Sequence, residues 1–267
     1  MIALGVVAAL MGIVGAKAAW ASVVLVDPAN TDGWTFSNGG KGSTGAGRLD
    51  IGPGTPPLGT GSAYLSVNDT ASAFLIGNTL FQGTPLSSIT GLSYDTYVIS
   101  ASGTNLTPAL QFVIATSPAN TGIFQGELVF SPTAGIVAGS WQTWNALTYA
   151  VSPINGGWWF SSPSRVGGTS CTEANPCTLA QVLAEFPNAE IGTTFGGELF
   201  QVGSGWNSFS GAVDDFVFDT TAANTTFNFD PNPVPEPGSL AIFGAALLGL
   251  ILVRTFQSTR SAPIRCA

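Results

Sequence analysis

The sequence predicts an all-β protein: a jelly-roll type β-sandwich with one short helix, followed by a C-terminal single transmembrane sorting helix. Short β-prone runs recur along the chain, with Gly, Pro, Asn or Ser between them. Only one stretch of the body has the spacing of an amphipathic helix. The body between the two apolar ends has about 210 residues, which suits one β domain.

Nine β-prone runs form the predicted strands of the body, which we place at residues 22–219. The clearest run is 91–100, because Leu92, Tyr94 and Val98 fall on one face of an extended chain. The nine runs are residues 22–26, 63–67, 73–76, 91–100, 110–115, 126–130, 141–150, 199–202 and 212–219.

The helix is predicted over residues 179–186, where Leu179 and Val182 begin an apolar stripe. Thr178 is the expected N-cap, and Pro187 ends the helix.

Two polar segments are predicted to lie outside the strands. Residues 31–62 contain ten glycines, which favours one or two long loops. This loop is either a flexible solvated segment or a cover over one sandwich edge that contacts an anionic or polyhydroxylated ligand. Residues 220–233 are predicted to be a polar tether between the body and the C-terminal signal.

Three cysteines divide between the body and the C-terminal tail. Cys171 and Cys177 enclose a five-residue loop, whereas Cys266 lies in the tail. In an oxidising compartment the first pair predicts a disulfide. A zinc site is the weaker reading, because two thiolates leave zinc undercoordinated and the chain has no histidine.

The N-terminus has the pattern of a signal peptide over residues 1–21. Residues 2–16 are apolar, and Ala19-Trp20-Ala21 fits the small-x-small cleavage rule. Nothing basic precedes the apolar run, since Lys17 follows it. An uncleaved N-terminal anchor or a start further upstream therefore stays open.

The C-terminal segment, residues 234–267, has three parts in order. Pro235-Glu236-Pro237 comes first, an apolar run without charge follows at residues 239–253, and a tail with three arginines ends the segment: Arg254, Arg260 and Arg265. The apolar run predicts a short transmembrane helix, and the arginines predict a cytoplasmic stop.

This arrangement resembles the PEP-CTERM sorting signal of exopolysaccharide-producing Gram-negative bacteria. The resemblance implies export, transient anchoring in the inner membrane, and processing near Pro-Glu-Pro by an exosortase-type membrane protease. The product is then expected at the cell surface or in the extracellular matrix.

The charge of the exported part is strongly acidic. From Asp27 to Glu236 the chain has 15 acidic and three basic residues, a net charge of −12, against −8 for the whole chain. Such a domain does not bind nucleic acid or an anionic membrane surface by charge.

The C-terminal third contains aromatic and Gly-rich segments in a particular order. Gly157-Trp158-Trp159-Phe160 is followed by the predicted helix, by Phe-Pro-Asn-Ala at 186–189, and by Val-Asp-Asp at 213–215. This order resembles the jelly-roll domains of secreted bacterial surface proteins, which are related in architecture to concanavalin-like lectins and carbohydrate-binding modules. The resemblance implies a sandwich, and a ligand only by analogy.

Sugar rings stack on aromatic side chains and need polar partners for their hydroxyls. Because neighbouring residues of a strand face opposite ways, one tryptophan of the Trp158-Trp159 pair should face the core and the other outward. A core role is the competing reading for each tryptophan. The candidate ligand-binding residues are Trp158, Trp159, Asn155, Trp206 and Asn207.

Asp214 and Asp215 suggest a structural role at the last strand of the body. One of the two must point inward, where an unpaired carboxylate is costly. It can accept hydrogen bonds from backbone amides of the 208–212 turn, which we favour, or join Asp27 in a structural calcium site. No other cofactor is expected.

Catalysis is not expected from this sequence. The absence of histidine excludes Ser-His-Asp and Cys-His hydrolases. A glycosidase needs two carboxylates across one cleft, which Glu127 and Glu198 could supply only if folding brings them together. The leading expectation is a non-catalytic protein that associates with exopolysaccharide. A purely structural surface protein and a polysaccharide-active enzyme are the alternatives.

Overall fold

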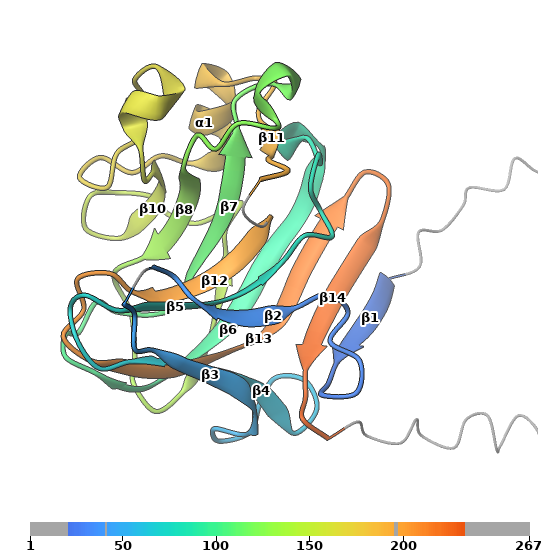
Figure 1. Cartoon of the computed structure of the whole chain (residues 1–267), viewed down its shortest axis with the longest axis vertical. Helices are drawn as coiled ribbons and strands as arrows, with labels where there is room; N and C mark the ends of the chain where they lie inside the picture. The colour runs from blue at the N-terminus through green and yellow to red at the C-terminus, as the bar shows by residue number, and fades with distance from the viewer. Residues whose placement is uncertain (1–20, 41, 195–196, 233–267) are drawn as a thin grey trace, which may run out of the picture.

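Two sheets of seven strands each form the body, which confirms the predicted β-sandwich (Figure 1). The structure is a computed structural model that describes residues 21–40, 42–194 and 197–232. We name each sheet after its central strand. The β13 sheet contains β1 (Ala21–Val26), β3 (Ala46–Ile51), β4 (Gly61–Val67), β6 (Ile89–Ala101), β9 (Trp141–Asn145), β13 (Phe209–Thr220) and β14 (Asn224–Phe229).

The β12 sheet has the strand order β10-β8-β7-β12-β5-β2, and β11 pairs with β7. Its strands are β2 (Thr35–Asn38), β5 (Ala73–Asn78), β7 (Ala109–Ala115), β8 (Glu127–Pro132), β10 (Gly156–Phe160), β11 (Glu190–Ile191) and β12 (Glu198–Gly203). The described helices are α1 (Leu179–Glu185) and three short 3-10 turns, Leu86–Ser88, Pro118–Asn120 and Pro163–Val166.

Strand β13 organises its sheet because it pairs with three strands. It runs antiparallel to β6 along one edge, and along the other edge it pairs first with β4 and then with β14. The register shifts between Asp214 and Val217, where the partner changes, and Asp215 has a φ of +48°. Strand β1 pairs in parallel with β14, so the first and last strands lie side by side (Figure 1).

Aromatic side chains from both sheets fill the space between them. Trp34 lies at the centre, with its ring centroid 5.1 Å from that of Phe229, 5.3 Å from that of Phe227 and 6.2 Å from that of Phe200. Each of these residues is at most 2% exposed. Burial of a large aromatic side chain contributes about 1.5–3 kcal/mol, so this cluster is a principal source of stability.

The helix and its cap agree with the sequence prediction. Thr178 accepts a hydrogen bond from the Gln181 backbone N–H, and the Gln181 side chain accepts one from the Thr178 N–H, which forms a capping box. Val182, on the inner face of the helix, is fully buried.

The prediction that residues 31–62 form one or two long loops without strands is wrong. Strands β2 and β3 lie within this segment, and several of its glycines are needed for close packing. A Cβ atom on Gly45 would lie 2.4 Å from the Phe74 Cβ, and one on Gly47 would lie 2.5 Å from the Phe74 ring. Glycine at these positions lets the strand approach an aromatic ring. The number of glycines in a sequence does not by itself distinguish this role from a flexible loop.

The prediction of a polar tether at residues 220–233 is also wrong over most of its length. Strand β14 occupies Asn224–Phe229, with Phe227 and Phe229 fully buried. After β14, Asp230 accepts hydrogen bonds from the Thr60 N–H at 2.7 Å and the Asn232 N–H at 2.9 Å. The body therefore extends to about residue 232.

The predicted signal peptide, Pro-Glu-Pro segment, transmembrane helix and arginine tail lie outside the described residues, apart from Ala21, the first residue of β1. Within the described ranges, no helix is long and apolar enough to cross a membrane.

Candidate functional site

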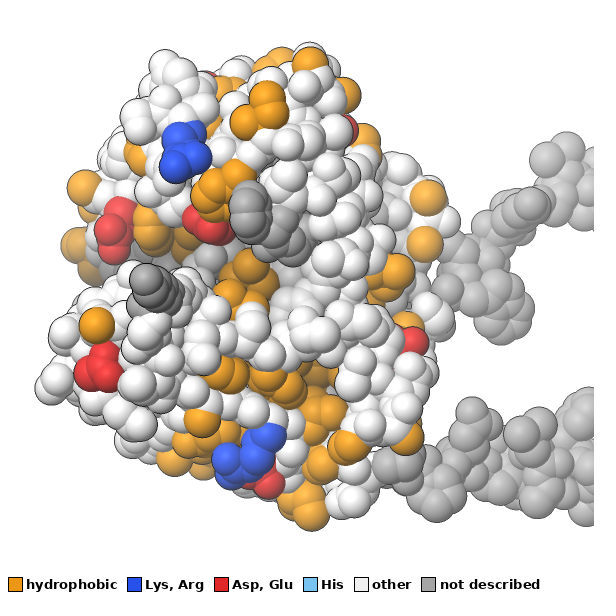
Figure 2. Space-filling view, viewed as in Figure 1, with side chains coloured by type: hydrophobic (Ala, Val, Ile, Leu, Met, Phe, Trp, Pro, Cys, Tyr) orange, Lys and Arg blue, Asp and Glu red, His pale blue; other side chains and the backbone are white. Residues whose placement is uncertain are grey.

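A groove crosses the outer face of the β12 sheet, the face turned away from the core. Two cavities of about 600 Å³ and 490 Å³ share Gly39, Glu127 and Gln201. A third, of about 150 Å³, continues past Trp159 and Trp206. We call these connected cavities the outer groove. Figure 2 shows the hollowed face, with hydrophobic and acidic side chains along it.

Strand pairing places a continuous row of residues across the outer groove. Each residue is the cross-strand partner of the next, and the row spans six strands. At about 4.8 Å per strand the row is about 24 Å long, enough for an oligosaccharide rather than a single sugar. The row runs Thr35, Gly77, Leu199, Gln111, Val129, Trp159.

Two glutamines on the outer face of the sheet have unused hydrogen-bonding capacity. Gln111 is only 7% exposed and Gln201 is half-buried, and both line the groove. No hydrogen bond joins either side-chain amide to another of the described residues. An amide offers both donors and acceptors, so a buried one without a protein partner is matched to a polar ligand or to water.

The two tryptophans of β10 divide as alternation predicts. Trp158 is fully buried, stacks on Phe112 at 5.6 Å between centroids, and donates from Nε1 to the Ala146 carbonyl at 2.9 Å. It therefore belongs to the core. Trp159 lies on the outer face, is partly exposed, and lines the groove.

Trp206 lines the same end of the groove from the β12–β13 connection. Its ring packs edge-on against Phe209 at 5.0 Å. Gly203 permits this path, because it has a φ of +97° and a Cβ there would lie 2.3 Å from the Ser72 carbonyl oxygen. Trp159 and Trp206 thus supply two partly exposed aromatic surfaces at one end of the groove.

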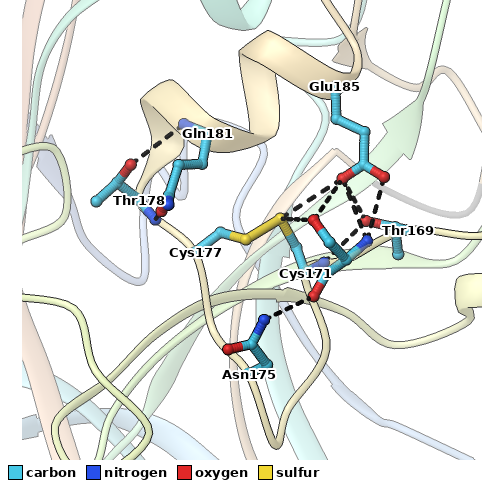
Figure 3. The surroundings of a disulfide bond; sticks show 8 residues. Thr169, Cys171, Asn175, Cys177, Thr178, Gln181 and Glu185 are labelled. Atoms are coloured by element: carbon cyan, nitrogen blue, oxygen red, sulfur yellow. Dashed lines mark hydrogen bonds between the residues drawn. A yellow bond between two sulfur atoms is a disulfide. The ribbon is translucent and has the colours of Figure 1, made fainter.

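The disulfide loop forms the wall beside Trp159. Cys171 and Cys177 are bonded, as predicted. The Cys177 N–H donates to the Trp158 carbonyl at 2.7 Å, and the Trp158 N–H donates to the Cys177 carbonyl at 2.9 Å, so the loop is attached to the edge of β10. Glu185 of α1 accepts hydrogen bonds from Thr169 and Ser170 on the other side (Figure 3).

Replacing both cysteines of the disulfide by serine is expected to lower the free energy of unfolding by about 2 kcal/mol, since the closed loop is short. Urea titration of the Cys171→Ser/Cys177→Ser variant measures this loss. Wild-type protein in reductant should match the variant, and Cys266→Ser should match oxidised wild type. Complete unfolding of the double variant would contradict a local role for the disulfide.

The two glutamates considered for catalysis lie on opposite faces of the β12 sheet. Glu127 pairs with Val113 on the outer face and lines the groove. Glu198 pairs with Phe112 on the core face, and neither of its carboxyl oxygens is accessible to solvent. Burial raises the pKa of Glu198 well above its usual range. These two carboxyl groups therefore cannot flank one bond of a bound substrate.

The aspartates considered for calcium contact backbone amides and other side chains. Asp27 accepts from the Ala29 and Asn30 N–H groups at 2.6 and 2.8 Å. Asp214 accepts from the Leu58 and Phe229 N–H groups, both at 3.1 Å, rather than from the 208–212 turn. In the described part of the chain, no group of three or more Cys, Asp or Glu side chains is arranged to hold a metal ion.

Asp214 occupies the break where β13 changes partner from β4 to β14, so its two hydrogen bonds join segments that have no ladder between them. Burial raises the pKa of Asp214 to about 7. Burial also raises the pKa of Asp95 to about 6. The hydrogen bond that Thr143 donates to it lowers the pKa, but by less than burial raises it. Asp215 is hydrogen-bonded to Asp95, and burial raises its pKa as well.

The two predicted asparagines lie outside the groove. The Asn155 side chain donates to the Ala150 carbonyl at 2.8 Å and stabilises a turn. Asn207 is exposed beside Trp206, but it is not among the lining residues. Sequence reasoning missed Gln111 and Gln201. The available signal was a single polar residue, Gln111, within the apolar run of β7.

The PEP-CTERM protein-sorting motif matches residues 233–254. No curated protein matches the chain in sequence. The sandwich and the motif together define an exported β-sandwich protein that is sorted at its C-terminus. The motif is the recognition signal for exosortase, and it begins one residue after Asn232, the last residue of the described body.

Proposed function

We propose that this protein associates non-catalytically with extracellular polysaccharide through the outer groove, after exosortase-dependent processing near Pro235-Glu236-Pro237. The observation that carries the proposal is the combination of two partly exposed tryptophans with two unpartnered glutamines along one groove. Flat apolar rings suit the CH faces of sugars, and amides suit their hydroxyl groups. The final location is then the cell surface or the matrix.

The separation of Glu127 from Glu198 rules out the one carboxylate pair that the sequence suggested for a glycosidase. A retaining or inverting glycosidase places two carboxyl groups within about 5–9.5 Å on the same cleft. Glu127 has no such partner in Glu198, whose carboxyl group is sealed inside the core. The Glu127 carboxylate instead accepts a hydrogen bond from the Ser161 hydroxyl.

Replacing Trp159 and Trp206 together by alanine is expected to weaken glycan binding on the order of tenfold or more, because each stacking ring contributes about 1 kcal/mol beyond its buried area. The measurement is a glycan array with the full-length chain in non-ionic detergent, followed by titration of the glycans that bind.

Trp141→Ala is the matched control for this experiment. Trp141 is also partly exposed, but it lies on β9 of the opposite sheet, where its Nε1 donates to the Pro53 carbonyl. Its replacement should leave glycan binding unchanged. Absence of binding to any glycan would favour a purely structural surface protein. Polysaccharide turnover that is lost in Glu127→Gln would favour an enzyme.

A further inference from the structure

The outer groove carries negative charge that no described cation balances. Glu127 lines it from β8, and Glu173 lines it from the disulfide loop, both in the part that holds Trp159. No described Lys or Arg lines any of its three cavities. In Figure 2 the blue side chains lie above and below the hollow rather than in it.

Neither carboxylate is neutralised within the protein. The side chain of Glu127 accepts from the Ser161 hydroxyl, which is uncharged. Glu173 is exposed, and no hydrogen bond joins its side chain to another described residue. A bound glycan that reaches from Trp159 to Gln111 would cover this region and remove water from it. Negative charge that loses water without a partner is costly.

The charge of the ligand follows from this arrangement. A polymer of uronic acids would meet like charge, both in the groove and from the acidic body around it. A neutral glycan would bury the carboxylates against hydroxyl groups alone. A glycan with protonated amines would offer charge-assisted hydrogen bonds to both carboxylates, which are the stronger kind.

We propose that the outer groove selects polysaccharides with free amino groups, that is, partly de-N-acetylated hexosamine polymers, through Glu127 and Glu173. This inference rests on the proposed function and names the ligand class for the same groove. Trp159, Trp206, Gln111 and Gln201 bind the sugar rings and hydroxyls, and the two glutamates select the amine.

The test compares two probes that differ only at the nitrogen: a glucosamine hexamer and an N-acetylglucosamine hexamer. Each is titrated into the full-length chain in non-ionic detergent, below neutral pH so that the amines are protonated. The glucosamine hexamer is expected to bind on the order of tenfold more tightly, the scale of two ligand-facing charge pairs. Added sodium chloride should reduce this preference.

Two double variants separate selection in the groove from general attraction to an acidic protein. Glu127→Gln/Glu173→Gln should remove the preference for glucosamine, because it weakens binding of the glucosamine hexamer on the order of tenfold. Asp50→Asn/Asp219→Asn removes the same charge from the opposite sheet and should leave the preference intact.

Three outcomes would overturn the inference. An equal loss of preference in both double variants would assign it to net charge. Equal affinity of wild type for the two hexamers, with binding still lost in Trp159→Ala/Trp206→Ala, would reject amine selection and leave the proposed function standing. Absence of binding to either hexamer would also reject amine selection, and the glycan array then decides the proposed function separately.

Discussion

Replacing Trp158 by alanine is expected to lower the free energy of unfolding by about 3–5 kcal/mol, the usual cost of removing a large aromatic side chain from a core. Trp158 is fully buried, its ring centroid lies 5.2 Å from that of Phe130, and its Nε1 donates to the Ala146 carbonyl. The replacement leaves a cavity between the two sheets and an unpaired buried carbonyl. Chemical denaturation measures the loss.

The neighbouring residue provides the control. Trp159 is chemically identical but lies on the outer face, so Trp159→Ala should lower the free energy of unfolding by less than about 1 kcal/mol. Similar losses for the two variants would contradict the assignment of Trp158 to the core and Trp159 to the groove.

The second large effect is a loss of stability as pH rises from about 4 to about 8, the opposite of ordinary acid denaturation. The pKa of Asp95 is about 6 and that of Asp214 about 7 in the folded protein, because both are buried. A raised pKa means that the folded state binds the proton more tightly than the unfolded chain. The contribution of these two carboxyl groups to the free energy of unfolding is therefore fully present below about pH 4. It is lost as the pH rises through about 6 and about 7.

At about 1.4 kcal/mol per pH unit the loss is on the order of a few kcal/mol. Urea titrations across this range measure it. An opposite trend limits stability at the acid end, because hydrogen bonds from Thr44 and Ser72 lower the pKa of Asp69, and that contribution disappears as Asp69 is protonated.

Asp95→Asn tests the origin of the slope. Asparagine keeps an oxygen that can accept from the Thr143 hydroxyl, but it does not titrate. The variant should show a flatter pH profile and gain stability above neutral pH. Asp50→Asn removes the same charge from the surface and should keep the wild-type slope. A wild-type slope in Asp95→Asn would reject the assignment.

The elements that could be predicted from sequence are those whose pattern is local. The alternation in β6, the capped helix α1 and the Cys171–Cys177 disulfide each depend on residues close together in the chain. Strands β2, β3 and β14 were missed for a physical reason. Glycines such as Gly45 and Gly47 are required by packing against Phe74, which is distant in sequence. In β14 only Phe227 and Phe229 are fully buried, and its Asn and Thr side chains give the segment the composition of a polar linker.

The candidate site was predicted in part. Trp159 and Trp206 were identified by residue type, but Gln111, Gln201 and Glu173 were not, because only the strand order of the β12 sheet brings them to one face. Strand register excludes Glu127 and Glu198 as a catalytic pair, since Glu127 faces the groove and Glu198 faces the core. Such pairings span long stretches of chain and leave no local signal.

The central position of β12 and β13 has a consequence for how the chain is exported. Strand β13 joins β4, β6 and β14, and β12 joins β5 to β7, so both sheets depend on residues near the end of the body. A chain that crosses the membrane with its N-terminus first presents β4, β5 and β6 well before the strands that join them. Contacts between residues so distant in sequence form late, and until then the apolar strands remain unpaired and exposed to solvent. In that order of export, both sheets can be completed only after β12 and β13 have crossed, just ahead of the sorting motif at residues 233–254.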